Sequence, residues 1–185
     1  MNKERIQDLI TQLLIEIEGS AELRPGTLET PKRVANAYLE IFEGYKQDLN
    51  KNIKLFKATY SEIIISKGIK FYSMCEHHIL PFYGTVDIAY MPGDYLLGIS
   101  KFARIVNYFA HRLNVQEKMT HDIANFLMDC DLNPRGVMVI IKGTHLCEIM
   151  RGVKQANPLI ITSAIKGTFK ENMATRTEAL NLLKL

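Results

Sequence analysis

The stretch Cys75-Glu76-His77-His78 places a thiol, a carboxyl group and two imidazole rings in four consecutive positions. Strand-like runs lie on both sides of it, at residues 69–72 and 82–90. A cysteine and a histidine three residues apart in a tight turn can bind one metal ion, because their side chains converge on one point. The sequence therefore predicts a turn after a strand that carries part of a metal site.

The composition is that of a single globular unit. The 185 residues suffice for one substantial domain, and 47% hydrophobic and 23% charged residues are ordinary values for a soluble protein. The formal net charge of +3 is too small to indicate a nucleic-acid partner. No apolar run approaches the roughly 18–20 residues that span a bilayer, so we expect no membrane partner. Three cysteines and no recognisable signal peptide in residues 1–20 indicate reduced thiols and a cytoplasmic location.

Two amphipathic helices are predicted before the strand-like region. Apolar residues recur at intervals of three and four from Ile6 to Ile17, which is typical of a helix with one buried face. Thr30 and Pro31 are typical of the start of a second helix, as its N-cap and its first helical residue. We expect residues 1–50 to form an N-terminal helical arm.

The remaining residues, 51–185, mix strand and helix patterns. Two short strands are expected around a turn at Lys67-Gly68, helices at 100–113 and 116–130, a buried strand at 136–141 and a short helix at 175–183. Strands and helices do not alternate regularly, which favours an α+β domain over a parallel α/β sheet.

A third metal ligand is expected beside another histidine, in the segment Thr144-His145-Leu146-Cys147 after the buried strand. Cys75, His78 and Cys147 would form a Cys2His zinc set whose fourth position is open for water, as in catalytic rather than structural zinc sites. Thiolate and imidazole ligands also favour zinc over magnesium or calcium. The alternative is buried apolar cysteines beside a hydrogen-bonded histidine, and we keep that interpretation for Cys130.

Several separated segments resemble, in order and context, those of GTP cyclohydrolase I. They are Cys75-Glu76-His77-His78, Gly98-Ile99-Ser100-Lys101-Phe102-Ala103-Arg104-Ile105-Val106, Val115-Gln116-Glu117, Thr144-His145-Leu146-Cys147, Met150-Arg151-Gly152-Val153 and Thr30-Pro31-Lys32-Arg33. The resemblance covers the chain from about residue 28 to the C-terminus. It implies the T-fold (tunnelling fold): an α+β subunit with an antiparallel β-sheet, helices packed on one face, and sheets of several subunits closed into a barrel. It also implies a homodecamer, a dimer of pentamers, with active sites between subunits.

This family opens the imidazole ring of GTP by hydrolysis. C8 leaves as formate, and the remainder rearranges to 7,8-dihydroneopterin triphosphate, the first step of tetrahydrofolate and pterin biosynthesis. By resemblance, Cys75, His78 and Cys147 hold Zn2+, and His77 and His145 are the catalytic proton carriers. Histidine suits that task because it titrates near neutral pH. His77 could instead orient a metal ligand.

The resemblance also implies how GTP is bound. Gln116 and Glu117 would recognise guanine, because a carboxylate can accept hydrogen bonds from N1–H and N2–H2. The triphosphate would meet cations at the start of a helix, where free N–H groups and the helix dipole favour anions. The residues concerned are Ser100, Lys101, Arg104, Arg151 and Arg33.

Two other functions remain open at this point. A T-fold relative could reduce a nitrile on a 7-deazaguanine with NADPH, using a nucleophilic cysteine and no zinc. A non-enzymatic module could use zinc only to stabilise its fold, which requires a fourth protein ligand.

Overall fold

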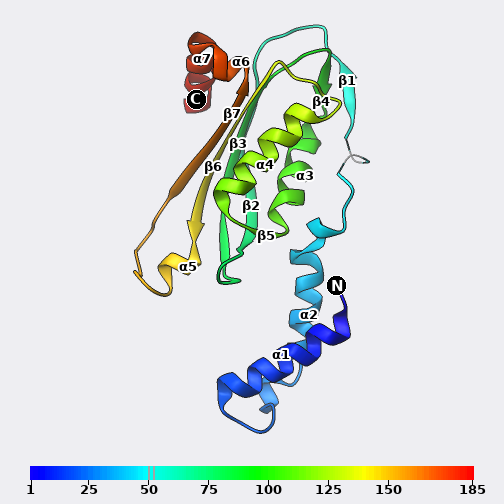
Figure 1. Cartoon of the computed structure of the whole chain (residues 1–185), viewed down its shortest axis with the longest axis vertical. Helices are drawn as coiled ribbons and strands as arrows, with labels where there is room; N and C mark the ends of the chain where they lie inside the picture. Colours follow the sequence, from blue (N-terminus) through cyan, green and yellow to red (C-terminus); the bar gives the residue numbers. More distant parts are fainter. Residues whose placement is uncertain (50, 52) are drawn as a thin grey trace. The chain divides into compact units, whose positions relative to one another are not determined.

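The computed structural model describes residues 1–49, 51 and 53–185, and it divides into two units, Met1–Glu43 and Gly44–Leu185 (Figure 1). The first unit holds α1 (Lys3–Glu18), the short helix η1 (Pro25–Thr27) and α2 (Thr30–Ile41), and η2 (Glu43–Tyr45) follows. Asn50, the predicted last residue of the helical arm, lies outside the described residues.

Both predicted helices of the first unit form, with one correction at the start of α2. The apolar face of α1 is not buried: Leu9, Leu13 and Ile17 are exposed. Thr30 is the first helical residue of α2, and Glu29 occupies the N-cap position. Glu29 has a right-handed helical conformation, and its carbonyl accepts a hydrogen bond from Arg33 N at 3.0 Å. The prediction of Thr30 as the N-cap was therefore wrong, because the chain enters α2 from a helical residue and not from an extended one.

The second unit is built on a five-stranded sheet in the order β5-β2-β3-β6-β7. Its strands are β2 (Ile64–Cys75), β3 (Pro81–Met91), β5 (Leu113–Asn114), β6 (Gly136–His145) and β7 (Ile160–Gly167), and the other elements are β1 (Leu55–Lys57), β4 (Tyr95–Leu97), α3 (Ile99–Ala110), α4 (Gln116–Asp129), α5 (Leu146–Ile149), α6 (Thr168–Glu171) and α7 (Met173–Lys184). The four long strands are antiparallel, and only β5 runs parallel to its neighbour β2. The predicted α+β class with an antiparallel sheet is confirmed.

Helices α3 and α4 lie along one face of the sheet (Figure 1). Residues of β6 that alternate along the strand, Val137, Val139 and Ile141, belong to the core beneath these two helices. Met138 points to the opposite face, where Phe169 and α7 pack against it. No described helix is long and apolar enough to cross a membrane.

The predicted turn at Lys67-Gly68 is instead a bulge inside the continuous strand β2. The pairing register with β3 shifts between Ser66 and Ile69, and Gly68 adopts a φ of +71°. The carboxylate of Asp87 accepts a hydrogen bond from Gly68 N at 2.7 Å. A partner nineteen residues away thus stabilises the irregular backbone and lets the strand continue.

Candidate metal centre and active site

Strand pairing brings the proposed metal ligands together from distant parts of the sequence. β2 ends at Cys75, and β6 pairs with β3 so that His145 lies opposite Phe82. Cys147 follows in the short helix α5. One ligand atom from each of Cys75, His78 and Cys147 lies within 4.8 Å of the other two. The structure therefore assembles the Cys2His set that the sequence analysis predicted.

The donor atoms fit a zinc ion in their chemistry and lie close to the spacing that zinc needs. In tetrahedral zinc sites with S and N ligands the ligand atoms lie about 3.3–3.8 Å apart, and Cys75 Sγ lies 3.9 Å from His78 Nδ1, slightly beyond that range. Among the described residues, no further cysteine, histidine or carboxylate belongs to this group. Burial raises the pKa of the Cys147 thiol, and the nearby Cys75 thiol adds to the effect. Metal binding must therefore displace thiol protons.

Backbone hydrogen bonds hold the turn that carries the ligands. Cys75 N donates to Leu80 O, and Ile79 N donates to Cys75 O, both at 2.9 Å. Glu76 N donates to Asn114 O in β5 at 3.1 Å. Ile79 has a φ of +52°, unusual for a β-branched residue, which the turn requires in order to reverse so tightly.

His145 is fixed by an aromatic neighbour and an amide. Its ring is parallel to that of Phe82 within 6°, with ring centroids 4.5 Å apart. Its Nε2 lies 2.9 Å from Oε1 of Gln116. Burial lowers the pKa of His145, while the carboxylates of Glu117 and Glu148 oppose that shift. Burial therefore favours the neutral form of the ring.

A cavity of about 200 Å³ connects these groups. Seven of the predicted site residues line it: Cys75, His77, His78, Gln116, Glu117, His145 and Cys147. A cavity for a drug-sized ligand usually measures about 300–1,000 Å³, so this one holds only part of a nucleotide. Arg151 adjoins the same region, because its Nη1 lies 2.8 Å from His78 Nε2.

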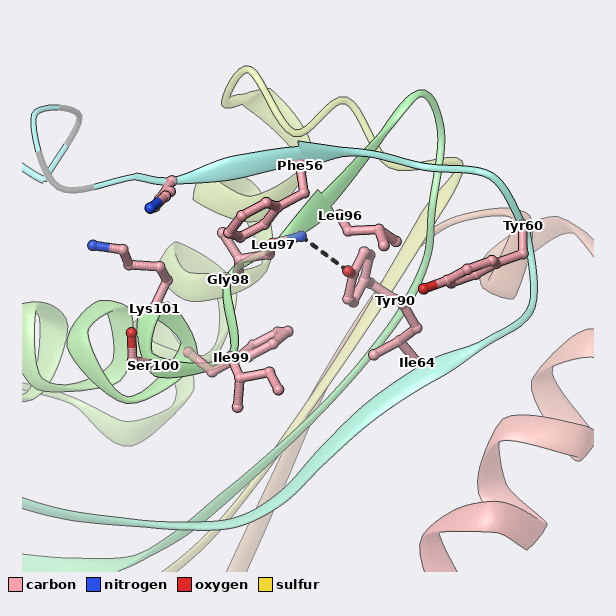
Figure 2. Close-up of a pocket in the computed structure, with 12 residues that line it drawn as sticks. Phe56, Tyr60, Ile64, Tyr90, Leu96, Leu97, Gly98, Ile99, Ser100 and Lys101 are labelled. Atoms are coloured by element: carbon pink, nitrogen blue, oxygen red, sulfur yellow. Dashed lines mark hydrogen bonds between the residues drawn. The ribbon is translucent and has the colours of Figure 1, made fainter.

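The predicted phosphate-binding residues of α3 lie elsewhere in the same unit. Ser100 and Lys101 line a separate, mostly apolar cavity of about 680 Å³ beside Phe56 and Tyr90 (Figure 2). The other end of α3 adjoins the metal turn, since Ala110 O accepts a hydrogen bond from Ser73 Oγ at 2.7 Å. A helix of 12 residues is about 18 Å long at 1.5 Å per residue. One chain thus does not bring the two sets of residues together.

Arg104 is the third predicted phosphate-binding residue of α3. It lies about one turn further along the helix than Ser100 and Lys101, and it is exposed. Arg33 belongs to the other unit, in α2.

A comparison with known families identifies the chain. The model of the family described as GTP cyclohydrolase I matches residues 6–184. The chain belongs to the GTP cyclohydrolase I family. A GTP cyclohydrolase 1 of Carboxydothermus hydrogenoformans is 43% identical over 99% of this chain and 95% of its own length. One of Clostridium kluyveri is 41% identical over the full length of both chains.

A further GTP cyclohydrolase 1, from Rhodopirellula baltica, is 44% identical over 97% of this chain and 78% of its own length. Among solved structures, the apo form of the archaeosine synthase QueF-Like covers 59% of this chain and 97% of its own at 19% identity, with a TM-score of 0.47. The full-length relatives show that this chain is an enzyme of the GTP cyclohydrolase I family, a family that acts on GTP.

Sequence reasoning missed Asn114, which also lines this cavity. Its side-chain amide donates to Phe109 O at 2.8 Å and to Ser73 Oγ at 2.9 Å, and its own carbonyl accepts from Glu76 N. It therefore ties the end of α3 to the metal turn. An asparagine between two predicted helices indicates a cap, but the sequence does not show that the metal turn is its partner.

Proposed function

We propose that this chain catalyses the zinc-dependent opening of the imidazole ring of GTP, with release of C8 as formate and formation of 7,8-dihydroneopterin triphosphate. This is the first step of tetrahydrofolate and pterin biosynthesis, and we place it in the cytoplasm. The observation that carries the proposal is the Cys75, His78 and Cys147 set in one cavity with His145 and Glu117.

The cavity supplies each group that the hydrolysis needs. When bound by the three ligands, Zn2+ would supply Lewis-acid activation of water at neutral pH. Glu117 accepts hydrogen bonds from N1–H and N2–H2 of guanine, which adenine cannot offer in that arrangement. His77 and His145 move the protons that opening of the ring requires at its nitrogen atoms.

We further propose that each active site is completed by a neighbouring copy in a homodecamer, a dimer of pentamers. Ser100, Lys101 and Arg104 of that copy bind the triphosphate, together with Arg151 and Arg33. Two observations support this arrangement: the small cavity at the proposed metal ligands and the length of α3, about 18 Å, in one chain.

The direct test is incubation of metal-quantified protein with GTP while formate and pterin fluorescence are followed. We expect one zinc ion per subunit and formate release that stops when zinc is removed. Cys147→Ser should lose zinc and activity together, whereas Cys130→Ser, a matched control outside the cavity, should keep both. Formate release by a zinc-free protein would refute zinc dependence. The same assay with a 7-deazaguanine nitrile and NADPH should show no reduction.

Mixed oligomers test the inter-subunit site. Coexpression of Cys147→Ser with Lys101→Gln chains should restore about one quarter of wild-type activity, the share of sites that combine two intact halves under random assembly. Coexpression of Cys147→Ser with Cys75→Ser chains is the control, because both changes affect the same half and no intact site can form. Equal activity in the two mixtures would contradict shared sites.

A further inference from the structure

Gln116 is the first residue of α4 and is only 1% exposed, so its side chain lies inside the protein. The side-chain nitrogen Nε2 donates to Ile160 O at 3.0 Å and to Thr162 Oγ1 at 3.1 Å, and lies 3.3 Å from Ile141 O. The side-chain oxygen Oε1 lies 2.9 Å from His145 Nε2. Both ends of the carboxamide are therefore engaged by the protein.

The partners determine which end of the carboxamide faces which way. The backbone oxygen atoms of Ile141 and Ile160 can only accept hydrogen bonds. The NH2 group of Gln116 must therefore face these two strands. Its oxygen is left to face His145.

The hydroxyl groups of two threonines require the same orientation of the Gln116 carboxamide. Thr120 Oγ1 donates its one hydrogen to the backbone carbonyl oxygen of Gln116 at 2.7 Å. Thr120 Oγ1 also lies 2.7 Å from Thr162 Oγ1, so Thr162 must be the donor between the two hydroxyl groups. Thr162 then accepts from Gln116, and only an NH2 group can supply that hydrogen.

The neighbouring strand leaves room for the carboxamide. A Cβ atom on Gly143, in β6, would overlap with Oε1 of Gln116. The ring of Phe82 stacks on the imidazole of His145 and restricts its tilt. The absence of a side chain at Gly143 and the ring of Phe82 thus both help to keep the amide oxygen against His145 Nε2.

We propose that Gln116 is a positioning residue that fixes the tautomer of His145. An amide oxygen only accepts, so His145 Nε2 carries the hydrogen, and in the neutral ring Nδ1 carries the lone pair. Nδ1 is then the nitrogen of His145 whose lone pair is not engaged by Gln116 and stays available to the substrate. The catalytic part of this inference rests on the proposed function, whereas the tautomer does not.

Nitrogen NMR of the zinc-loaded, 15N-histidine-labelled enzyme tests the tautomer in the resting protein. The His145→Asn spectrum identifies the resonances of His145. We expect an unprotonated Nδ1 and a protonated Nε2 in the wild type. Gln116→Leu, which has no acceptor, should shift toward Nδ1–H, and Gln12→Leu, an exposed control in α1, should match the wild type. An Nδ1–H tautomer in the wild type, or an unchanged tautomer in Gln116→Leu, would overturn the proposal.

Kinetics with GTP separate positioning from direct contact with guanine. In Gln116→Leu we expect kcat for formate release to fall at least about tenfold, because proton transfer loses its aligned acceptor, while KM changes by less than about threefold. A raised KM with unchanged kcat would assign Gln116 to guanine binding and overturn the positioning role. Absence of formate from the wild type would refute the proposed function, yet the NMR result would still report the tautomer.

Discussion

Replacement of Gly143 by alanine should destabilise the enzyme by about 3 kcal/mol. The new Cβ would overlap with Oε1 of Gln116, so the carboxamide must leave its place. It would lose its hydrogen bonds to Ile160 O and Thr162 Oγ1 and the one accepted from His145. A net contribution of roughly 1 kcal/mol for each of these bonds gives the total, and a partner left buried and unpaired adds to it.

Urea unfolding of the zinc-loaded proteins measures this loss. All samples need the same subunit concentration, because the stability of an oligomer depends on it. Gly98→Ala is the matched control: its φ is −59°, and the nearest atoms lie 3.4 Å from the added Cβ, an ordinary contact. We expect the control to stay within about 0.5 kcal/mol of the wild type. A change of less than about 1 kcal/mol in Gly143→Ala would refute the view that Gln116 is tightly held.

Three further predictions concern the carboxylate of Glu117 and the thiols of Cys147 and Cys130. Glu117→Gln should weaken GTP binding by about 1–3 kcal/mol, measured at equilibrium in the inactive His145→Ala background; unchanged affinity would remove Glu117 from the guanine contact. Because burial raises the pKa of the Cys147 thiol, zinc binding should displace the proton of that thiol and weaken as the pH falls from 8 to 6. Calorimetry in buffers of different ionisation enthalpy measures the proton release. Burial likewise raises the pKa of the Cys130 thiol, so less thiolate is present at pH 8. Alkylation of Cys130 by iodoacetamide should therefore be at least about threefold slower than alkylation of free cysteine. An equal rate would contradict the burial of that thiol.

Local patterns predicted those elements whose stability is local. The apolar spacing of three and four residues indicated α1, α3 and α4 within a few residues of their observed bounds. The bulge in β2 was mistaken for a turn because Lys67-Gly68 has the composition of one. The carboxylate of Asp87, which stabilises the bulge, lies on the next strand, so no local pattern contains it.

The proposed metal ligands could be predicted because the residue types themselves indicate their chemistry. Cysteine and histidine at this spacing are typical of a zinc site, and a second segment with a histidine and a cysteine indicates where to look for the third ligand. The distance between the proposed phosphate-binding residues of α3 and the proposed metal ligands could not be predicted, because it depends on which end of α3 meets β2. That packing is a property of the folded unit and not of either motif.

In the proposed function, the start of α4 links catalysis to substrate recognition. Consecutive residues of a helix point about 100° apart, so Gln116 faces the strands β6 and β7 while Glu117 lines the cavity. The hydrogen bonds that anchor Gln116 therefore also set the direction of the carboxylate of Glu117. A change that rotates α4 against the sheet should disturb His145 and the guanine contact together, and so should alter kcat and KM at once. A change confined to either side chain should alter only one of them.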